Sequence, residues 1–504
     1  MTLHLFNTMT RRIEPFTPIH PGKVSLYTCG PTVWNYAHIG NFRTFLFEDL
    51  LRRWLKASGF QVYHVMNLTD VDDRIIAEAG KAGKSISEFV EPYVQAFFED
   101  VDWLRIDRAE AYPRATAFVA PMIELVGRLL ASGVAYKGED GSVYFSIARF
   151  PAYGRLSRLD TRELKAGASD RVSADDYSKE DARDWVLWKA AKSEDEKVGA
   201  AWDAPFGRGR PGWHLECSAM ALDLIGKAGY GSVLDIHAGG VDLIFPHHED
   251  EIAQSCAFTG QPDFARVWMH SEFLNVRGTK MSKRFGNITT PRDLRQDGVD
   301  PAAIRYLFYQ TNYGQKFDLT DESLAAAAQG IRRLREFYER LTGHAREVPA
   351  RDGPMADAAA EFRRNFSSEL DNNLNSAGAT AGLFDLIKIG NREMDQRGGG
   401  AIVALEALMW ADAVLGILPA AGQGRVVITG PSMSGSGTVT PSDLSPDDPG
   451  AQQEWAATWG GLRRDAKKAK NYKEADRIRD LLKAAGWEVR DKPDGSIEVI
   501  SLKG

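Results

Sequence analysis

A predicted helix that begins beside a histidine is the first feature with chemical potential. Ala37-His38-Ile39-Gly40-Asn41 follows a predicted strand and precedes that helix. The first N–H groups of a helix, together with the positive end of its dipole, favour a bound phosphate. Gly40 would let a flat base or a sugar approach the backbone, and His38 could donate a hydrogen bond to a phosphate oxygen. Taken alone, the segment is explained more simply by a capping turn with an incidental histidine.

A cluster of cations near the middle of the chain could bind the same phosphates. Residues 280–287 read KMSKRFGN and contain Lys280, Lys283 and Arg284, with a glycine on either side of the cluster. Such a loop suits a polyphosphate whose negative charge grows during phosphoryl or adenylyl transfer. A solvated basic loop is the commoner origin of this composition. The pairing of an early phosphate turn with a later lysine loop is rarer, and it favours the functional interpretation.

Two of the three cysteines and a segment with two histidines contain side chains that could bind a metal ion. Cys29 ends a predicted strand, Cys217 lies far downstream, and residues 247–251 read HHEDE. His247 and Glu251 are four positions apart and therefore share one helical face. Cys, His and Glu are all acceptable zinc ligands. Because no CxxC or HxxxH pair occurs, spacing alone favours buried structural thiols and an ordinary acidic helix.

The elements that must position these residues alternate between strand and helix. Apolar spacing predicts a helix over 42–56, and a strand pattern lies on either side of it. This order indicates a parallel βαβ unit. Two further strand patterns occur later, so the simplest fold is one parallel sheet domain that is split by an inserted subdomain at about 104–225. The four strands are predicted at residues 23–29, 61–67, 233–237 and 266–273.

The second half of the chain changes character. Four helical patterns in a row predict a bundle at 324–341, 358–370, 377–396 and 401–418. Between 419 and 450, 19 of 32 residues are Gly, Pro, Ser or Thr, which is typical of a flexible linker. The tail from 454 predicts two helices and a short hairpin. Its segment 463–483 has nine Lys or Arg against four Asp or Glu and could follow a phosphate backbone, although such a face is usually only solvated.

Charge and composition exclude several classes of protein. The chain has 504 residues, with 62 Lys and Arg against 69 Asp and Glu, a net charge of −7. This excludes a protein that coats nucleic acid through bulk charge, but not one with a local basic patch. Three cysteines exclude a disulfide framework and favour a reducing cytoplasm. The N-terminal residues lack the apolar stretch of a signal peptide, and no segment is suited to span a bilayer. We therefore expect a cytoplasmic protein without a membrane partner.

With these residues in view, the chain closely resembles the cysteinyl-tRNA synthetases, a family of class I aminoacyl-tRNA synthetases. Residues 38–41 (HIGN) are similar to the HIGH signature, and residues 280–284 (KMSKR) are similar to the KMSKS signature. The similarity runs from the first ten residues to about 420 and resumes in the tail. The longer and more specific motifs are YTCGPTV at 27–33, NLTDVDD at 67–73, RPGWHLECS at 210–218 and FPHHE at 245–249.

The expected architecture is an α/β chain with a doubly wound, Rossmann-like parallel sheet. Its catalytic domain would span residues 1–320 and contain the insertion. A helical-bundle tRNA-binding domain would follow at 321–418, then a flexible linker at 419–453 and a small α+β anticodon-region domain at 454–504.

The resemblance implies the site residues. It implies one catalytic zinc ion per chain, in place of the metal-free interpretation, held by Cys29, Cys217, His247 and Glu251. It implies Mg²⁺ with ATP and an ATP site formed by His38, Gly40, Asn41 and Lys283, with His38, Lys280 and Lys283 as catalytic residues. It also implies an amino-acid pocket that includes Thr69, Trp213, His237 and Asp242, in which Asp242 would pair with the substrate ammonium group.

The implied activity is ATP-dependent activation of L-cysteine and its transfer to the terminal adenosine of tRNA(Cys), by a protein expected to be a monomer. A pocket that senses only size separates two substrates by about 1–3 kcal/mol per methylene. Zinc–thiolate bonding would instead separate cysteine from serine by the softness of sulfur. Tail aromatics that could stack on anticodon bases are Trp455, Trp459, Tyr472 and Trp487, although core packing is the simpler role for each.

Two departures from the family pattern concern the phosphate site. Asn41 replaces the last histidine of HIGH, and Arg284 replaces the last serine of KMSKS.

Two other functions are compatible with parts of the chain. One is a cysteine ligase acting on a small amino-sugar, which would not need the basic tail. The other is a catalytically inactive RNA-binding paralogue, which would not need intact zinc and lysine residues.

Overall fold

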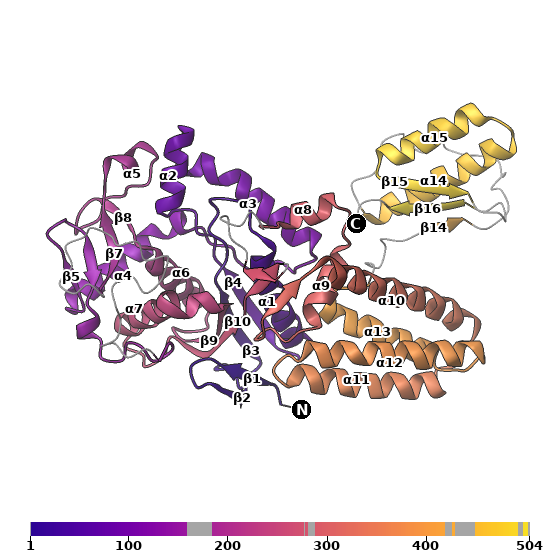
Figure 1. Ribbon diagram of the computed structural model, residues 1–504, viewed down its shortest axis with the longest axis horizontal. Coiled ribbons are helices and arrows are strands. Elements are labelled where there is room, and N and C mark those ends of the chain that lie inside the picture. Colours follow the sequence, from indigo (N-terminus) through magenta and orange to yellow (C-terminus); the bar gives the residue numbers. More distant parts are fainter. Residues whose placement is uncertain are drawn as a thin grey trace. The chain divides into compact units, whose positions relative to one another are not determined.

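The computed structural model describes residues 2–158, 184–276, 278–280, 288–418, 426–428, 449–491 and 497–501. The chain forms two compact units, Met1–Ile417 and Leu418–Gly504, and Figure 1 colours them along the sequence. The finer domain boundaries expected above, including those of the 104–225 insertion, stay predictions.

A parallel sheet of four strands forms the centre of the first unit. The strands lie in the order β10-β9-β3-β4, and all run in the same direction. Leu26 and Tyr27 of β3 are fully buried, as expected for a strand covered on both faces. All four predicted strands are present, and their carboxyl ends meet at one edge, where open α/β sheets bind ligands. They are β3 (Lys23–Thr28), β4 (Gln61–Met66), β9 (Leu234–Gly240) and β10 (Ala265–Ser271).

The helix after β3, α1 (Ile39–Ala57), begins three residues before its predicted start at 42. His38 is the N-cap, and its Nδ1 accepts a hydrogen bond from the backbone N of Asn41 at 3.2 Å. Oδ1 of Asn41 accepts in return from the backbone N of His38 at 3.1 Å. This is a capping box. Histidine is not a preferred N-cap residue, so the apolar pattern alone placed the helix start too late.

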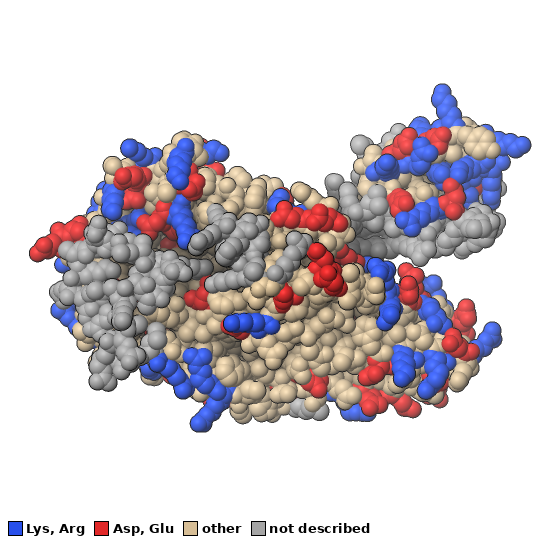
Figure 2. All heavy atoms as spheres, in the orientation of Figure 1, with Lys and Arg blue, Asp and Glu red and all other residues tan. Residues whose placement is uncertain are grey.

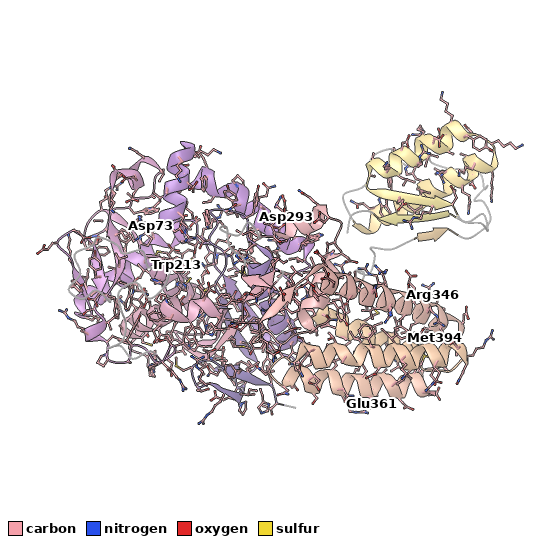
Figure 3. The ribbon with its side chains drawn as sticks, in the orientation of Figure 1. Asp73, Trp213, Asp293, Arg346, Glu361 and Met394 are labelled. Carbon is pink, nitrogen blue, oxygen red and sulfur yellow. The ribbon has the colours of Figure 1, made fainter. Side chains whose placement is uncertain are left out.

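Between β4 and β9 the chain forms a second, antiparallel sheet in the order β5-β6-β7-β8. Asp73 accepts a hydrogen bond from Nζ of Lys189 at 2.7 Å and pairs with Arg210, so ion pairs join this sheet to the start of α2 (Figure 3). The strands are β5 (Ala135–Lys137), β6 (Val143–Phe145), β7 (Trp185–Ala190) and β8 (Gly209–Pro211). The helices of this stretch are α2 (Asp73–Ala82), α3 (Ile86–Trp103), α4 (Val119–Ala131) and α5 (Ser193–Lys197).

Two helices flank β9 in sequence. The helix α6 (Trp213–Lys227) precedes it and α7 (Glu249–Thr259) follows it, with short helical turns at Val241–Leu243 and Ile244–His248 in between. The smaller elements of the unit are β1 (His4–Asn7), β2 (Arg12–Pro15), β11 (Leu274–Val276), β12 (Thr279–Lys280), β13 (Phe317–Leu319) and α8 (Pro291–Gln296).

The four predicted bundle helices are all present and lie side by side in Figure 1. A buried arginine of α9 joins the bundle to α1: the Arg305 guanidinium donates to Oδ2 of Asp49 at 2.7 Å and to the carbonyl of Leu415 at 2.8 Å. The four bundle helices are α10 (Asp321–Glu347), α11 (Pro354–Asp371), α12 (Ser376–Asp395) and α13 (Ala401–Leu415). The shorter helix α9 (Pro301–Tyr309) precedes them in the chain.

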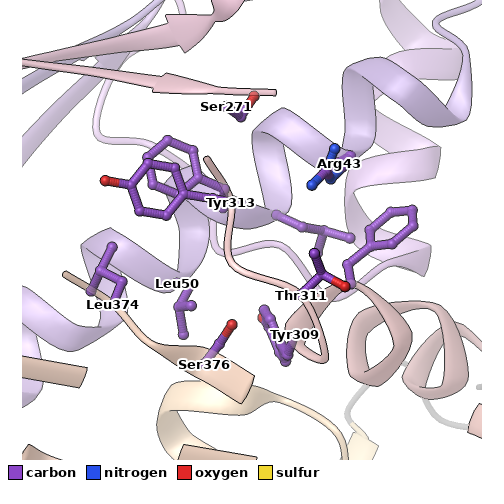
Figure 4. Close-up of a pocket in the computed structure, with 11 residues that line it drawn as sticks. Arg43, Leu50, Ser271, Tyr309, Thr311, Tyr313, Leu374 and Ser376 are labelled. Atoms are coloured by element: carbon purple, nitrogen blue, oxygen red, sulfur yellow. The ribbon is translucent and has the colours of Figure 1, made fainter. Parts of the chain in front are cut away.

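Figure 4 shows a pocket where α1 meets α9 and the start of α12. The Arg43 side chain reaches it and donates to the carbonyl oxygens of Glu272 at 2.8 Å and Phe273 at 2.7 Å. Its lining includes Leu50, Tyr309, Tyr313, Leu374 and Ser376. None of the residues that line this pocket was predicted to bind a metal ion, a phosphate or an amino acid.

The described part of the second unit contains two helices and an antiparallel sheet in the order β14-β16-β15. Three of the tail aromatics, Trp455, Trp459 and Trp487, form its core, whereas Tyr472 is 61% exposed. Strand β14 and the start of α14 fall within the range predicted as linker, 419–453. The elements are β14 (Val426–Ile428), α14 (Pro449–Lys468), α15 (Tyr472–Ala484), β15 (Trp487–Asp491) and β16 (Ile497–Ser501).

No helix in the described parts of the chain is both long enough and apolar enough to cross a membrane. The longest helix, α10, has charged residues along most of its length.

Candidate active site and metal centre

Four side chains with metal-binding atoms meet beyond the carboxyl end of β3. Cys29 follows that strand, Cys217 comes from α6, and His247 and Glu251 come from the turn before α7 and from α7 itself. All four residues are buried, and one ligand atom from each lies within 4.8 Å of the others. The structure thus brings the predicted zinc ligands together, although they are up to 222 positions apart in the chain.

Two distances in this cluster are close to those around a four-coordinate metal ion. Sγ of Cys29 lies 4.0 Å from Sγ of Cys217 and 3.8 Å from Oε1 of Glu251. Tetrahedral zinc with bonds of about 2.0–2.3 Å separates its ligand atoms by roughly 3.3–3.8 Å. Nε2 of His247 and Oε1 of Glu251 are closer, at 2.8 Å, which is a hydrogen-bond distance. Two thiols, an imidazole and a carboxylate form a donor set that zinc accepts.

Further imidazoles surround the four residues. Nε2 of His237 lies 2.6 Å from Oε2 of Glu251, and Nε2 of His248 lies 3.4 Å from Sγ of Cys29. Nδ1 of His214 lies 3.0 Å from Nδ1 of His247. Partners of this kind fix the orientation of metal ligands. Cys29, His237, His248 and Glu251 also form a second group with metal-ligand spacing, which shares two members with the first.

Burial and mutual contacts shift the pKa values of the cluster. Burial raises the pKa of Cys29 well above its usual value, whereas the hydrogen bond with Cys29 lowers the pKa of Cys217 to about 6. Although burial raises the pKa of Glu251, His237 and His247 lower it to about 2. At neutral pH Cys217 and Glu251 are therefore deprotonated, whereas Cys29 keeps its proton. Although burial lowers the pKa of His247, Glu251 and Cys217 raise it to about 10, so its imidazole is protonated as well. A metal ion at this cluster would displace both protons, because it binds the deprotonated forms.

His214 and His248 were missed by sequence reasoning, and so was His270, whose Nε2 lies 2.8 Å from Nδ1 of His248. Burial lowers the pKa of His270 to about 3 and the pKa of His214 and His248 well below the usual value, so all three are neutral. Two features of the sequence could have identified two of them. His248 directly follows the predicted ligand His247, and His270 lies near the carboxyl end of a predicted parallel strand.

The predicted phosphate turn forms the start of α1. Because Nδ1 of His38 accepts from the backbone N of Asn41, a hydrogen bond from His38 to phosphate would have to use Nε2. Oδ1 of Asn41 is likewise engaged by the cap, which leaves its amide nitrogen as the group for a ligand. The backbone N of Ile39 donates to the carbonyl of Thr289 at 2.8 Å. Gly40 is half-buried in the first turn.

The four predicted amino-acid-pocket residues occupy different surroundings. Trp213 begins α6, and its ring stacks on His247 with centroids 4.4 Å apart and an angle of 29°. Thr69 is buried, and its hydroxyl accepts from the side-chain amide of Asn67 at 3.1 Å. His237 is fully buried against Glu251. Asp242 is exposed, in the turn that follows β9.

Gly30 explains how the strand end approaches its neighbour so closely. A Cβ at this position would lie 1.8 Å from the carbonyl oxygen of Asn67, so any side chain would displace the backbone. The backbone N of Gly30 also donates to Oδ1 of Asn67 at 2.9 Å. These contacts fix the position of Cys29 relative to the segment that carries Thr69.

The two predicted loop lysines are only partly covered by the structure. Lys280 ends β12, which pairs with β11. Lys283 lies outside the described residues, as does Arg284.

Comparisons with known proteins identify the family. Residues 15–329 match the model of the class I tRNA synthetase (C) catalytic domain. A cysteine–tRNA ligase of Chlamydia pneumoniae is 44% identical over 98% of this chain and 97% of that protein, and one of Protochlamydia amoebophila is 40% identical over similar shares, 98% and 97%. A Mycobacterium tuberculosis methionyl-tRNA synthetase in complex with methionyl-adenylate has a TM-score of 0.57 at 14% identity, over 78% of this chain and 92% of that one. The last likeness shows the fold alone. Since the family model covers more than half of the chain and the relatives match almost all of it, the chain belongs to the cysteine–tRNA ligase family of class I aminoacyl-tRNA synthetases.

Proposed function

We propose that the protein activates L-cysteine with ATP, transfers it to tRNA(Cys), and selects it through a zinc ion held by Cys29, Cys217, His247 and Glu251. Family membership identifies the protein as a ligase that joins cysteine to tRNA. The observation that carries the zinc proposal is the convergence of two thiols, an imidazole and a carboxylate within 4.8 Å, in a buried cluster.

The physical problem is that cysteine and serine have nearly the same shape. A difference in size of one methylene is worth only about 1–3 kcal/mol in an apolar pocket. When bound, zinc would supply a soft Lewis acid that lowers the pKa of a nearby thiol and prefers sulfur to a neutral hydroxyl. Trp213 stacks on His247, so an amino acid whose side chain points at the four ligands would lie against the indole ring.

The rest of the amino-acid pocket follows from position. In the proposal, the exposed carboxylate of Asp242 pairs with the substrate ammonium group, and Thr69 and His237 complete the walls around the cluster. Asp242 and His237 belong to β9 or the turn after it, and β9 pairs with β3, which leads to Cys29.

ATP would bind at the start of α1. His38 donates from Nε2 to a phosphate oxygen, Gly40 admits the nucleotide, Asn41 contributes its side-chain amide, and Lys280 and Lys283 stabilise the charge on the phosphates, with Mg²⁺ on ATP. The cysteine carboxylate attacks the α-phosphate, and pyrophosphate leaves with its electron pair. No side chain acts as a nucleophile, so the rate depends on positioning and on electrostatic stabilisation.

The remaining assignments concern the whole chain. We infer a doubly wound catalytic domain at 1–320, a tRNA-binding bundle at 321–418 and a tail domain at 454–504 that reads the anticodon region, in a cytoplasmic monomer. On the face seen in Figure 2, Lys and Arg side chains gather over α14 and α15, which supports an RNA-binding tail.

The deciding experiment combines metal analysis with two activity assays. We expect about one equivalent of zinc per chain, cysteine-dependent ATP–pyrophosphate exchange, and charging of tRNA(Cys). Exchange without charging would favour a ligase for a small amino-sugar, and failure of exchange with every amino acid would favour an inactive RNA-binding protein. A protein that is active with cysteine but contains no metal would refute the zinc proposal alone.

A further inference from the structure

An exposed aromatic cluster lies immediately before the phosphate turn. Tyr36 is 46% exposed, and among the described residues only three other large apolar side chains are comparably exposed. Cζ of Arg292 lies 5.1 Å from the centroid of the Tyr36 ring, and the Tyr93 ring lies 5.3 Å away at an angle of 73°. These three residues are called the Tyr36 platform below.

The platform is held in place from both sides. Arg292, on α8, donates to Oε2 of Glu99 on α3 at 2.6 Å, so this ion pair joins the two helices. Because Glu99 compensates the charge of Arg292, the guanidinium serves to support the ring rather than to attract a distant anion. The backbone N of Val33 donates to the carbonyl of Thr69 at 3.0 Å and anchors the base of the loop that carries Tyr36.

The platform is close in sequence to the proposed reaction centre, and a hydrogen bond links the segments that carry the two. Tyr36 stands two positions before His38 and seven after Cys29. The hydrogen bond from the backbone N of Ile39 to the carbonyl of Thr289 joins the start of α1 to the residues that lead into α8. A ligand that passes over the platform is therefore next to the turn where the proposed adenylate forms.

We propose that the Tyr36 platform stacks an unpaired base at the 3′ end of tRNA(Cys) during transfer of the amino acid. Single-stranded RNA is bound by exposed aromatic rings and arginine planes, because every base has a π-face. The terminal adenosine has to reach the adenylate, and the unpaired nucleotides before it must then lie beside this turn. The inference rests on the proposed transfer to tRNA.

A second aromatic–arginine pair lies two residues away. Cζ of the exposed Arg74 is 5.5 Å from the centroid of the Trp34 ring. Two aromatic rings on one short loop, each beside an arginine from another helix, could contact successive nucleotides of a single strand. The adenine of ATP also has a face that can stack, so the experiment must separate the two ligands.

The test compares Tyr36→Ala with Tyr36→Trp in the full-length protein. For Tyr36→Ala we expect cysteine-dependent pyrophosphate exchange within about twofold of wild type. Single-turnover transfer from preformed adenylate to tRNA(Cys) at subsaturating RNA should fall by roughly tenfold, the lower range of one lost base–aromatic stack. Tyr36→Trp keeps a stacking surface and should retain transfer. Ile13→Ala, which removes another exposed side chain (51%) from the same unit, is the matched control and should change neither rate.

The binding arm uses two RNAs, intact tRNA(Cys) and the same RNA without its three 3′-terminal nucleotides. Tyr36→Ala should weaken binding of the intact RNA and leave binding of the shortened RNA unchanged. Equal weakening of both RNAs, or unchanged transfer, would overturn the proposal. A raised KM for ATP in the exchange assay would assign Tyr36 to the adenine instead. If the wild-type protein forms adenylate but charges no tRNA, the proposed function fails before the platform is tested.

Discussion

His237→Phe tests whether this histidine positions a metal ligand or touches the amino acid. The His237 side chain is fully buried, and its ring stacks on Trp268 with centroids 4.6 Å apart and an angle of 19°. Nε2 lies 2.6 Å from Oε2 of Glu251. Phenylalanine keeps an aromatic ring in the stack and removes only the hydrogen-bonding nitrogens, so the substitution isolates the contact with Glu251.

The magnitude follows from the type of hydrogen bond that is lost. A hydrogen bond to a charged group is worth about 1.5–3 kcal/mol, and the buried carboxylate oxygen would be left without this donor. Removal of a partner that orients a metal ligand typically costs about 10–100-fold in metal affinity. We therefore expect His237→Phe to weaken zinc binding by about 10–100-fold.

The assay is competition for zinc with a chromophoric chelator, followed by the KM for cysteine in pyrophosphate exchange at saturating zinc. His64→Phe is the matched control: His64 is also buried, on β4 of the same sheet, and its Nε2 lies 2.9 Å from Oγ1 of Thr28 rather than beside a ligand atom. It should leave zinc affinity within about threefold of wild type, well below the effect expected when an orienting partner is lost. Unchanged zinc affinity in His237→Phe, together with a raised KM for cysteine, would show that His237 contacts the amino acid and not the metal site.

The remaining predictions address the ligands, the loop, the tail and the core. Cys217→Ser should reduce bound zinc and raise the KM for cysteine, checked by metal analysis and exchange kinetics; unchanged values of both would refute the ligand assignment. Lys283→Ala should mainly lower kcat for activation, because it stabilises charge that peaks in the transition state, and a change confined to the KM for ATP would contradict that role. Deletion of residues 454–504 should leave adenylate formation intact and impair tRNA charging; equal loss of both would remove the argument for an anticodon-reading tail. Asp49→Asn should lower the free energy of unfolding at pH 7 by about 3–5 kcal/mol, because it leaves the buried Arg305 without its carboxylate. Although burial raises the pKa of Asp49, Arg305 and an adjacent arginine hold it below its usual value, so the difference between wild type and variant in urea unfolding should shrink as the pH falls through that lowered pKa.

The sequence was sufficient to predict the strands because buried parallel strands are short apolar runs with clear ends. It could not show which strands are neighbours. His237 lies close to Cys29, and His270 contacts His248, only because β9 lies between β3 and β10, an order that periodicity does not contain. The zinc ligands were likewise not predictable from spacing, since Cys29 and Cys217 are 188 positions apart. Their assignment came from resemblance, and the structure adds the distances.

For the aromatic residues of the tail, the sequence could not predict which side chains are buried. Trp459 and Tyr472 were both candidates for stacking on bases, but one is 1% exposed and the other 61%. Trp459 lies on the side of α14 that packs into the core with α15 and the sheet, whereas Tyr472 is the first residue of α15 and lies outside that core. Of the four aromatics, Tyr472 alone is thus placed to meet an RNA.

The short segment between Cys29 and His38 connects selection with activation. Cys29 contributes to the proposed metal centre, and His38, nine positions later, caps the helix that faces the proposed phosphates. Gly30 fits so closely against the carbonyl of Asn67 that the start of the segment has little freedom to shift. Its end is fixed by the hydrogen bond from Ile39 to Thr289. Because both ends of the segment are held, a cysteine bound at Cys29 and an ATP bound at His38 would contact one segment of fixed length, which favours the positioning that the reaction needs.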